Sequence, residues 1–146
     1  MSAPSETLRA LAETVVPGQP DDPTPGASAV EADRFVEHYL DVVQPGLAAS
    51  VCDTLDRLAG DRRRGATFAS LHRGERAGVL DALWEHPSEE VRDLAVLLST
   101  LAIAAVYSEW SGIDGDGSMV RRPLGWELTG FPGPRSGVPS LLYEEP

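Results

Sequence analysis

The chain has 146 residues, which suits a single domain, and its hydrophobic and charged fractions, 42% and 24%, are ordinary for a globular protein. Twelve arginines and no lysine stand against 23 acidic residues, so the net charge is -11, which argues against nucleic acid and anionic membranes as partners. Cys52 is the only cysteine, which excludes an internal disulfide and a thiolate metal cluster.

Five helices are predicted from apolar residues at helical spacing, bounded by residues that favour helix ends. In chain order they cover residues 6–16, 29–43, 45–58, 73–85 and 89–110. Ser28 and Glu31 have the spacing of a capping box, which predicts the start of the second helix. Gly60 is expected to end the third helix, because glycine favours C-terminal caps.

The second predicted helix carries an apolar stripe of Phe35, Tyr39 and Val43, which should face the core. The loop after the third predicted helix holds three consecutive arginines, Arg62–Arg64. Most charge runs of this kind are solvated, and we expect the same here, although the run also suits an acidic patch on a partner.

The fifth predicted helix is apolar on almost all sides from Leu94 to Val106, as is typical of the buried centre of a bundle. Its apolar run, residues 94–107, is shorter than the roughly 20 residues that span a bilayer. The residues after Met1 show neither a signal region nor a twin arginine. We therefore expect a cytoplasmic chain that does not insert directly into a membrane.

Residues 112–146 hold 7 glycines and 5 prolines, so no helix of ordinary length is expected there. The predicted fold is all-α, a small bundle of about five helices in one domain, residues 1–146. Residues 1–111 should form the helical core and residues 112–146 a long irregular tail. Such segments are usually functional or disordered, and the aromatic residues here favour a tail that packs on something.

No catalytic, cofactor-binding or metal-binding residues are predicted in this chain. His38, His72 and His86 lie on different predicted helices or helix ends, and no two have the i, i+4 spacing of a metal pair. The glycine-rich run 112–117 follows a helix rather than a strand, so it does not match a dinucleotide-binding turn. Its two aspartates, Asp114 and Asp116, only faintly match a calcium loop, and a tight turn is the simpler interpretation.

Four aromatic residues gather around the end of the fifth predicted helix and the tail: Tyr107, Trp110, Trp126 and Phe131. Packing explains most aromatic side chains, so these rings can simply close one end of the bundle. Alternatively, Trp126 and Phe131 anchor a partner, since aromatic residues are enriched in binding hot spots. Composition alone leaves both interpretations open.

The tail also carries a specific motif. Residues 125–134 read Gly-Trp-Glu-Leu-Thr-Gly-Phe-Pro-Gly-Pro, which resembles the C-terminal motif of the gluconate 2-dehydrogenase subunit 3 family, Gly-Trp-x-x-x-Gly-aromatic-Pro-Gly-Pro. Three upstream segments are similar to this family in order and spacing. They are residues 8–18, which end Val-Val-Pro-Gly, residues 25–40, which begin Pro-Gly-Ala, and residues 68–80, which begin Phe-Ala-Ser-Leu.

The resemblance implies a small, non-catalytic partner of a large flavin-dependent dehydrogenase of the glucose-methanol-choline type. In such complexes the large subunit holds FAD and oxidises a sugar or another alcohol, and the small subunit supports its folding, stability or export. The partner-binding residues expected here come from the aromatic cluster and the tail motif: Tyr107, Trp110, Trp126, Phe131, Pro132, Gly133 and Pro134.

Two features depart from the family pattern. Many relatives carry a twin-arginine export signal, which this sequence lacks. The turn after the long helix reads Ser-Gly-Ile-Asp-Gly-Asp-Gly at residues 111–117, where relatives commonly have a Tyr-Gly-Gly-like turn.

The alternative function is a free-standing helical binding or scaffold protein, or a homodimer joined through the aromatic tail.

Overall fold

The structure, a computed structural model, describes residues 3–19, 26–113 and 118–132. Within these residues the fold is all-α, as predicted, with no strand beyond one isolated bridge between Ile113 and Met119. It has six α-helices where about five were predicted, because a short helix forms within residues 112–146, which were expected to be an irregular tail. The helices are α1 Pro4–Val15, α2 Ala32–Val43, α3 Leu47–Arg62, α4 Arg73–Trp84, α5 Glu89–Tyr107 and α6 Leu124–Thr129. Two short 3-10 helices, Ala27–Ala29 and Glu109–Gly112, precede α2 and follow α5.

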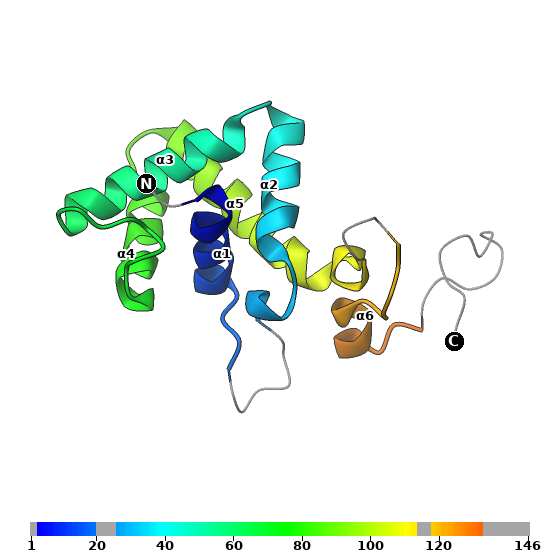
Figure 1. The fold of residues 1–146 in the computed structure, drawn as a ribbon. Helices are drawn as coiled ribbons and strands as arrows, with labels where there is room; N and C mark the ends of the chain where they lie inside the picture. The colour runs from blue at the N-terminus through cyan, green and yellow to red at the C-terminus, as the bar shows by residue number, and fades with distance from the viewer. Residues whose placement is uncertain (1–2, 20–25, 114–117, 133–146) are drawn as a thin grey trace.

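Helix α1 lies at the centre of the bundle and contacts α2, α3, α4 and α5 (Figure 1). Its apolar face is completely buried at Leu8, Leu11 and Ala12. These side chains meet the fully buried side chains of the neighbouring elements: Val36, Leu40, Leu55, Phe68, Val79, Leu98 and Val106. Burial of such apolar side chains is the main favourable term in folding, which explains why a polar chain with net charge -11 still forms a bundle.

The predicted start of the second helix is wrong. Ser28 lies in the first 3-10 helix, and α2 begins only at Ala32, with Glu31 at the N-cap position and no side-chain cap. Glu31 instead pairs with Arg34, at 2.6 Å between carboxylate and guanidinium. The 3-10 turn pairs the N–H groups of Ala29 and Val30, and the first N–H group of α2, that of Ala32, donates to the Val30 carbonyl at 2.9 Å.

The predicted apolar stripe of α2 is only partly correct. Phe35 is buried, but the core is completed by Val36 and Leu40, whereas Tyr39 and Val43 are exposed. The Tyr39 ring packs against the Phe35 ring, at 4.5 Å between centroids, and Val43 lies in the last turn of the helix. Burial therefore depends on which neighbouring elements cover the helix, and not on residue spacing alone.

Helix α3 continues past Gly60 and ends at Arg62, so the predicted glycine stop is wrong. Contacts between helices outweigh the low helix propensity of glycine here. The Arg62 guanidinium donates to the backbone carbonyl of Gly78 in α4, and Arg63 donates to the carbonyl of Ser70 at 2.8 Å. Two of the three consecutive arginines therefore hold the connection between α3 and α4, although all three are exposed to solvent.

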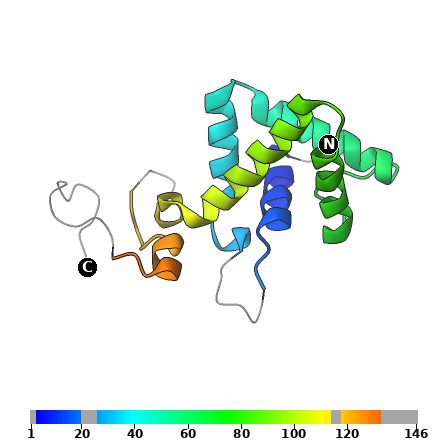
Figure 2. The same cartoon turned by 180° about the vertical axis from the view of Figure 1, so that it is seen from behind.

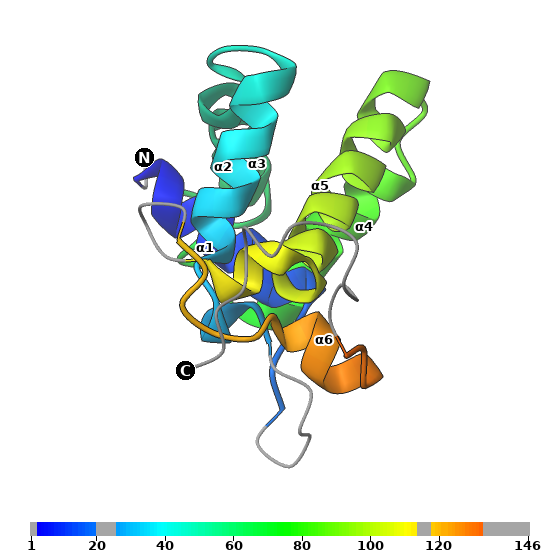
Figure 3. The same ribbon diagram turned by 90° about the vertical axis from the view of Figure 1, so that its right-hand side faces the viewer.

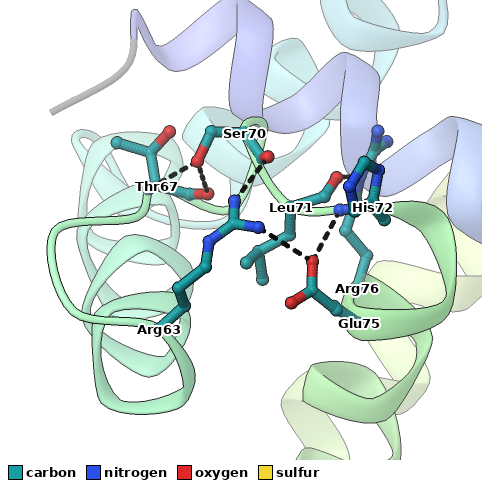
Figure 4. Close-up of polar contacts among 7 residues, drawn as sticks. All are labelled: Arg63, Thr67, Ser70, Leu71, His72, Glu75 and Arg76. Atoms are coloured by element: carbon teal, nitrogen blue, oxygen red, sulfur yellow. Dashed lines mark hydrogen bonds and ion pairs between the residues drawn. The ribbon is translucent and has the colours of Figure 1, made fainter.

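A polar junction joins α3, the following turn and the start of α4 (Figure 4). The Glu75 carboxylate accepts a hydrogen bond from the backbone N–H of His72 at 2.9 Å and pairs with Arg63 at 3.3 Å. The backbone donor at a helix start has no partner within the helix, so the Glu75 side chain satisfies it. This contact explains the role of Glu75, which lies in the third family-like segment, residues 68–80.

Helix α5 crosses the rear face of the bundle, with no other helix in front of it in Figure 2. Its inner face is buried at Ala95, Leu98, Ala102, Ala105 and Val106. The helix is not the buried centre of the bundle that its apolar composition predicted, because its opposite face exposes apolar side chains to solvent.

By length and composition alone, α5 with the following 3-10 helix could cross a membrane, contrary to the expectation from the shorter apolar run. The stretch 89–112 has 24 residues and a mean hydropathy of 1.5, and 33% of its most apolar window is buried in the bundle. Core helices of soluble proteins satisfy the same two criteria.

Candidate partner-binding surface

Helix α6 sits against the C-terminal end of α5 (Figures 1 and 3). The contact is made through Gly125, which is buried against the backbone of Tyr107. A Cβ atom at position 125 would lie 2.9 Å from the carbonyl carbon of Tyr107 and closer still to its oxygen. Only glycine fits this approach, which explains the first residue of the Gly-Trp motif.

The buried Ser111 fixes the segment before α6 to the bundle. Its hydroxyl donates to the carbonyl of Ser108 at 3.0 Å and accepts from the backbone N–H of Leu124 at 2.9 Å. Its own carbonyl accepts from Nε of Arg121 at 2.7 Å. Arg121 also reaches the carbonyl of Ala29, at 3.4 Å, beside the start of α2.

Sequence reasoning did not identify Ser111 or Arg121 as positioning residues. A buried serine that follows a helix and an exposed arginine in a tail carry no periodic signal. The contacts that fix the segment before α6, from Ser111 to Leu124 and to Arg121, join residues 13 and 10 positions apart in the chain. The repeated serine at positions 108 and 111 was the only local hint, since serine side chains commonly pair with nearby backbone groups.

The second half of the motif is a helix stop followed by a folded-back ring. Gly130 takes the left-handed conformation at φ 67°, and the backbone N–H of Phe131 donates to the carbonyl of Trp126 at 3.0 Å. This is the hydrogen-bond pattern of a Schellman cap, and Pro132 cannot continue the helix. The cap brings the Phe131 and Trp126 rings together edge to face, with centroids 5.4 Å apart.

The predicted partner-binding residues fall into two groups. Trp110 faces the bundle, because its ring packs on Phe35 at 5.4 Å and stacks near His38 at 6.2 Å between centroids. Tyr107 and Phe131 are 39% and 44% exposed, and Trp126 is half-buried beneath Phe131.

The structure therefore brings Tyr107, Trp126 and Phe131 together at the junction of α5 and α6, with Trp110 turned inward beside them. Pro132 is exposed, and Gly133 and Pro134 lie outside the described residues. Whether these residues bind a partner stays a prediction.

The exposed face of α5 continues this apolar surface. Val96, Ile103 and Tyr107 are 45%, 47% and 39% exposed, and Thr100 between them is exposed as well. These four residues, here called the α5 stripe, follow one another at steps of four, three and four residues, so they share one side of the helix. The stripe ends at Tyr107, and the backbone of Tyr107 is in contact with Gly125 of α6.

The buried polar groups of the described residues are satisfied within the bundle. Arg9 pairs with the nearly buried Asp33 at 3.0 Å, and every buried side-chain nitrogen or oxygen has a hydrogen-bond partner. Burial, assisted by the charges of nearby Asp56 and Asp53, raises the pKa of the Cys52 thiol to about 12. A thiol with so high a pKa stays protonated and is a poor nucleophile.

No group of three or more histidine, cysteine, aspartate or glutamate side chains gathers in the described part of the chain. The hollows on the described surface are shallow. One of about 400 Å³ between α1 and α4 is lined by Arg9, Arg76 and Glu13, and Arg9 and Arg76 are already paired with acids. What the described surface offers chemically is an apolar contact surface on α5 and α6.

Comparison with known proteins identifies one family. The model of the family described as gluconate 2-dehydrogenase subunit 3 matches residues 3–133, which includes the helical bundle, the α5 stripe and most of the Gly-Trp motif. Neither the curated proteins nor the solved structures contain a significant match to this chain.

Proposed function

As the chain belongs to the gluconate 2-dehydrogenase subunit 3 family, we propose that it is the small, non-catalytic subunit of a larger oxidoreductase. The large subunit is an FAD-dependent enzyme of the glucose-methanol-choline type that oxidises a sugar or another alcohol. The small subunit binds it and stabilises it or assists its maturation. FAD belongs to the large subunit, and the small subunit itself holds no cofactor. The complex is cytoplasmic in this proposal.

The family match over residues 3–133 is the observation that carries the proposal. Two structural features support it. The family-like segments serve to build the bundle and its α6 corner, residues 124–132, and none of them lines a deep pocket among the described residues. The α6 corner and the α5 stripe then present aromatic and aliphatic side chains to solvent, which suits a protein that buries them against a partner.

Co-expression tests the proposal. The proposed large subunit should be made with and without this chain, and its soluble yield, flavin absorbance and alcohol-oxidising activity compared. We expect yellow, FAD-loaded enzyme that co-purifies with the small subunit, while the small subunit alone is colourless. Equal yield, flavin content and activity in both preparations would contradict a stabilising role.

Light scattering after size exclusion separates this proposal from the free-standing alternative. A mixture of the two subunits should elute as one species whose mass is the sum of whole numbers of both chains. A stable homodimer of this chain that ignores the large subunit would favour the scaffold interpretation instead.

A further inference from the structure

We infer that the α5 stripe and the α6 corner form one continuous docking surface for the large subunit. The matching surface of the large subunit is an apolar area of its own that is edged by arginine and lysine. This inference rests on the proposed function and adds to it the face of the chain that is used and the chemistry of the partner's matching surface. It also extends the contact to Val96, Thr100 and Ile103, beyond the residues expected from the tail motif.

The first argument is the apolar character of the stripe. Residues 94–107 of α5 contain no charged side chain, and the helix still exposes Val96 and Ile103 by almost half. The side chains on the opposite face of the same helix already complete the core. The exposed face therefore contributes nothing to this bundle's interior, and covering it would remove apolar area from water.

The second argument is continuity between the two elements. The stripe ends at Tyr107, and the backbone of that residue is in contact with Gly125 of α6. The α6 corner then exposes Leu128 and Phe131, by 39% and 44%. The corner is held in place by the Ser111 hydrogen bonds and by its Schellman cap, so it is a preformed surface with little ordering entropy to lose on binding.

The third argument is the charge around the edge of the surface, which favours the large subunit over a second copy of this chain as the binding partner. The first charged residues on either side of the uncharged run are the exposed acids Asp93 and Glu109, and α6 exposes a further acid, Glu127. One basic side chain at the corner, Arg122, is already engaged, since its guanidinium donates to the Phe131 carbonyl. A second copy of this chain would bring the same three acids to the interface, with a net charge of -11 on each copy. Like charges brought together at an interface margin are unfavourable. The margins instead complement arginine and lysine on a different protein, the large subunit.

Glutamate substitution of the stripe tests the proposed face. Ile103→Glu places a charge in the middle of the stripe and should lower the affinity for the large subunit at least tenfold, measured by calorimetry or interferometry. Val43→Glu is the matched control, because Val43 is also exposed and apolar but lies at the end of α2, outside the surface. Circular dichroism and thermal unfolding should be the same for both variants, since both side chains are exposed.

Photo-crosslinking provides a readout that does not depend on affinity. A benzophenone amino acid in place of Thr100 should crosslink to the large subunit within the assembled complex, and the same group in place of Val43 should not. Glu109→Arg together with Glu127→Arg should slow association and reduce its dependence on salt, because the complementary margin is reversed.

The outcomes separate the inference from the proposed function. If the wild-type chains bind but Ile103→Glu has no effect and Val43→Glu disrupts the complex, the proposed face is wrong while the small-subunit role stands. Crosslinks from position 100 to a second copy, or to the chain's own residues 133–146, would also overturn the inference. No binding between the wild-type chains would overturn the proposed function itself.

Discussion

Gly125 of α6 is in direct contact with the backbone of Tyr107 at the end of α5, and the space for a side chain at position 125 is already filled by that backbone. The contact joins the helical core to the segment that carries the Trp126 and Phe131 rings. The position of both rings therefore depends on the absence of a single Cβ atom.

Gly125→Ala should displace α6 from α5. Overpacking of this kind typically costs about 1–3 kcal/mol, and here the cost falls on a peripheral element, so local rather than global stability should change. We expect faster hydrogen exchange of the amides of residues 124–131 and unchanged exchange in α1. Gly74→Ala in α4 is the control, because no atom lies within 4 Å of its Cβ position, and it should be neutral or slightly stabilising. Equal protection of α6 in both variants would contradict the close contact.

Arg76 joins three segments of the bundle through one guanidinium group. Nε donates to the carbonyl of Leu71 at 2.9 Å, and a terminal nitrogen reaches the carbonyl of Ala10 in α1 at 3.2 Å. The side chain is only 17% exposed, so its loss leaves two carbonyls without these donors.

Arg76→Ala should lower the free energy of unfolding by about 1.5–3 kcal/mol, the range for hydrogen bonds from charged groups. Arg76→Lys should recover little of it, since one ammonium lacks the planar fork that reaches both carbonyls. Urea unfolding measures both changes, with Arg73→Ala, an exposed arginine of the same helix, as the control expected within about 0.5 kcal/mol of wild type. If the two alanine variants unfold at the same urea concentration, Arg76 does not join these segments.

Cys52 should make stability fall at alkaline pH. Its pKa is raised from 9.0 to about 12 in the folded chain, first by burial and then by nearby carboxylates. Above pH 9 the unfolded chain therefore loses a proton that the folded chain retains, so folding becomes less favourable as pH rises towards 12. The slope from this group reaches at most about 1.4 kcal/mol per pH unit.

The difference between wild type and Cys52→Ala isolates this contribution, because all other titrating groups are shared. The free energy of unfolding of the two proteins should converge as the pH rises above 9, after a constant offset at lower pH for the lost packing and the thiol contact with the Pro4 carbonyl. An offset that stays constant through this range would show that the thiol ionises equally in both states.

The sequence predicts those features of the fold that depend on residues close together in the chain. Five helices were predicted near their observed positions because an amphipathic pattern and a stop at proline act within one or two turns. The extension of α3 beyond Gly60 was not predicted, since it depends on arginine contacts with residues in α4 and the preceding turn. The apolar composition of α5 showed that the helix is central but could not show which side lacks a covering neighbour.

The candidate surface also combines features that the sequence predicted with features that depend on tertiary contacts. The motif resemblance located the residues of the α6 corner, but the inward turn of Trp110 and the exposure of Ile103 come from tertiary packing. The six residues of α6 are too few for a periodic pattern, and their placement depends on Ser111 and Gly125 contacts across the fold. Such contacts have no signature in a single sequence.

The three tryptophans allow packing and partner binding to be separated. Trp110 is partly buried and packs on Phe35 at the edge of the core, and Trp126 supports Phe131 in the α6 corner. Trp84 is 44% exposed at the end of α4 and belongs to neither the α5 stripe nor the α6 corner. Trp110→Ala should therefore lower the free energy of unfolding by about 2 kcal/mol, below the range of about 3–5 kcal/mol for a fully buried ring, because Trp110 is partly exposed.

Trp126→Ala should leave the helix content unchanged and weaken the complex with the large subunit by about 2 kcal/mol or more, the size of a hot-spot effect. The Phe131 ring loses its support in this variant, so both aromatic anchors are affected together. Trp84→Ala is the control of the same residue type and should change neither quantity by much. Circular dichroism, urea unfolding and calorimetric titration of the three variants give the result. If Trp126→Ala instead unfolds the bundle, and binding falls only as much as the folded fraction of the protein does, the ring serves packing and does not bind the partner.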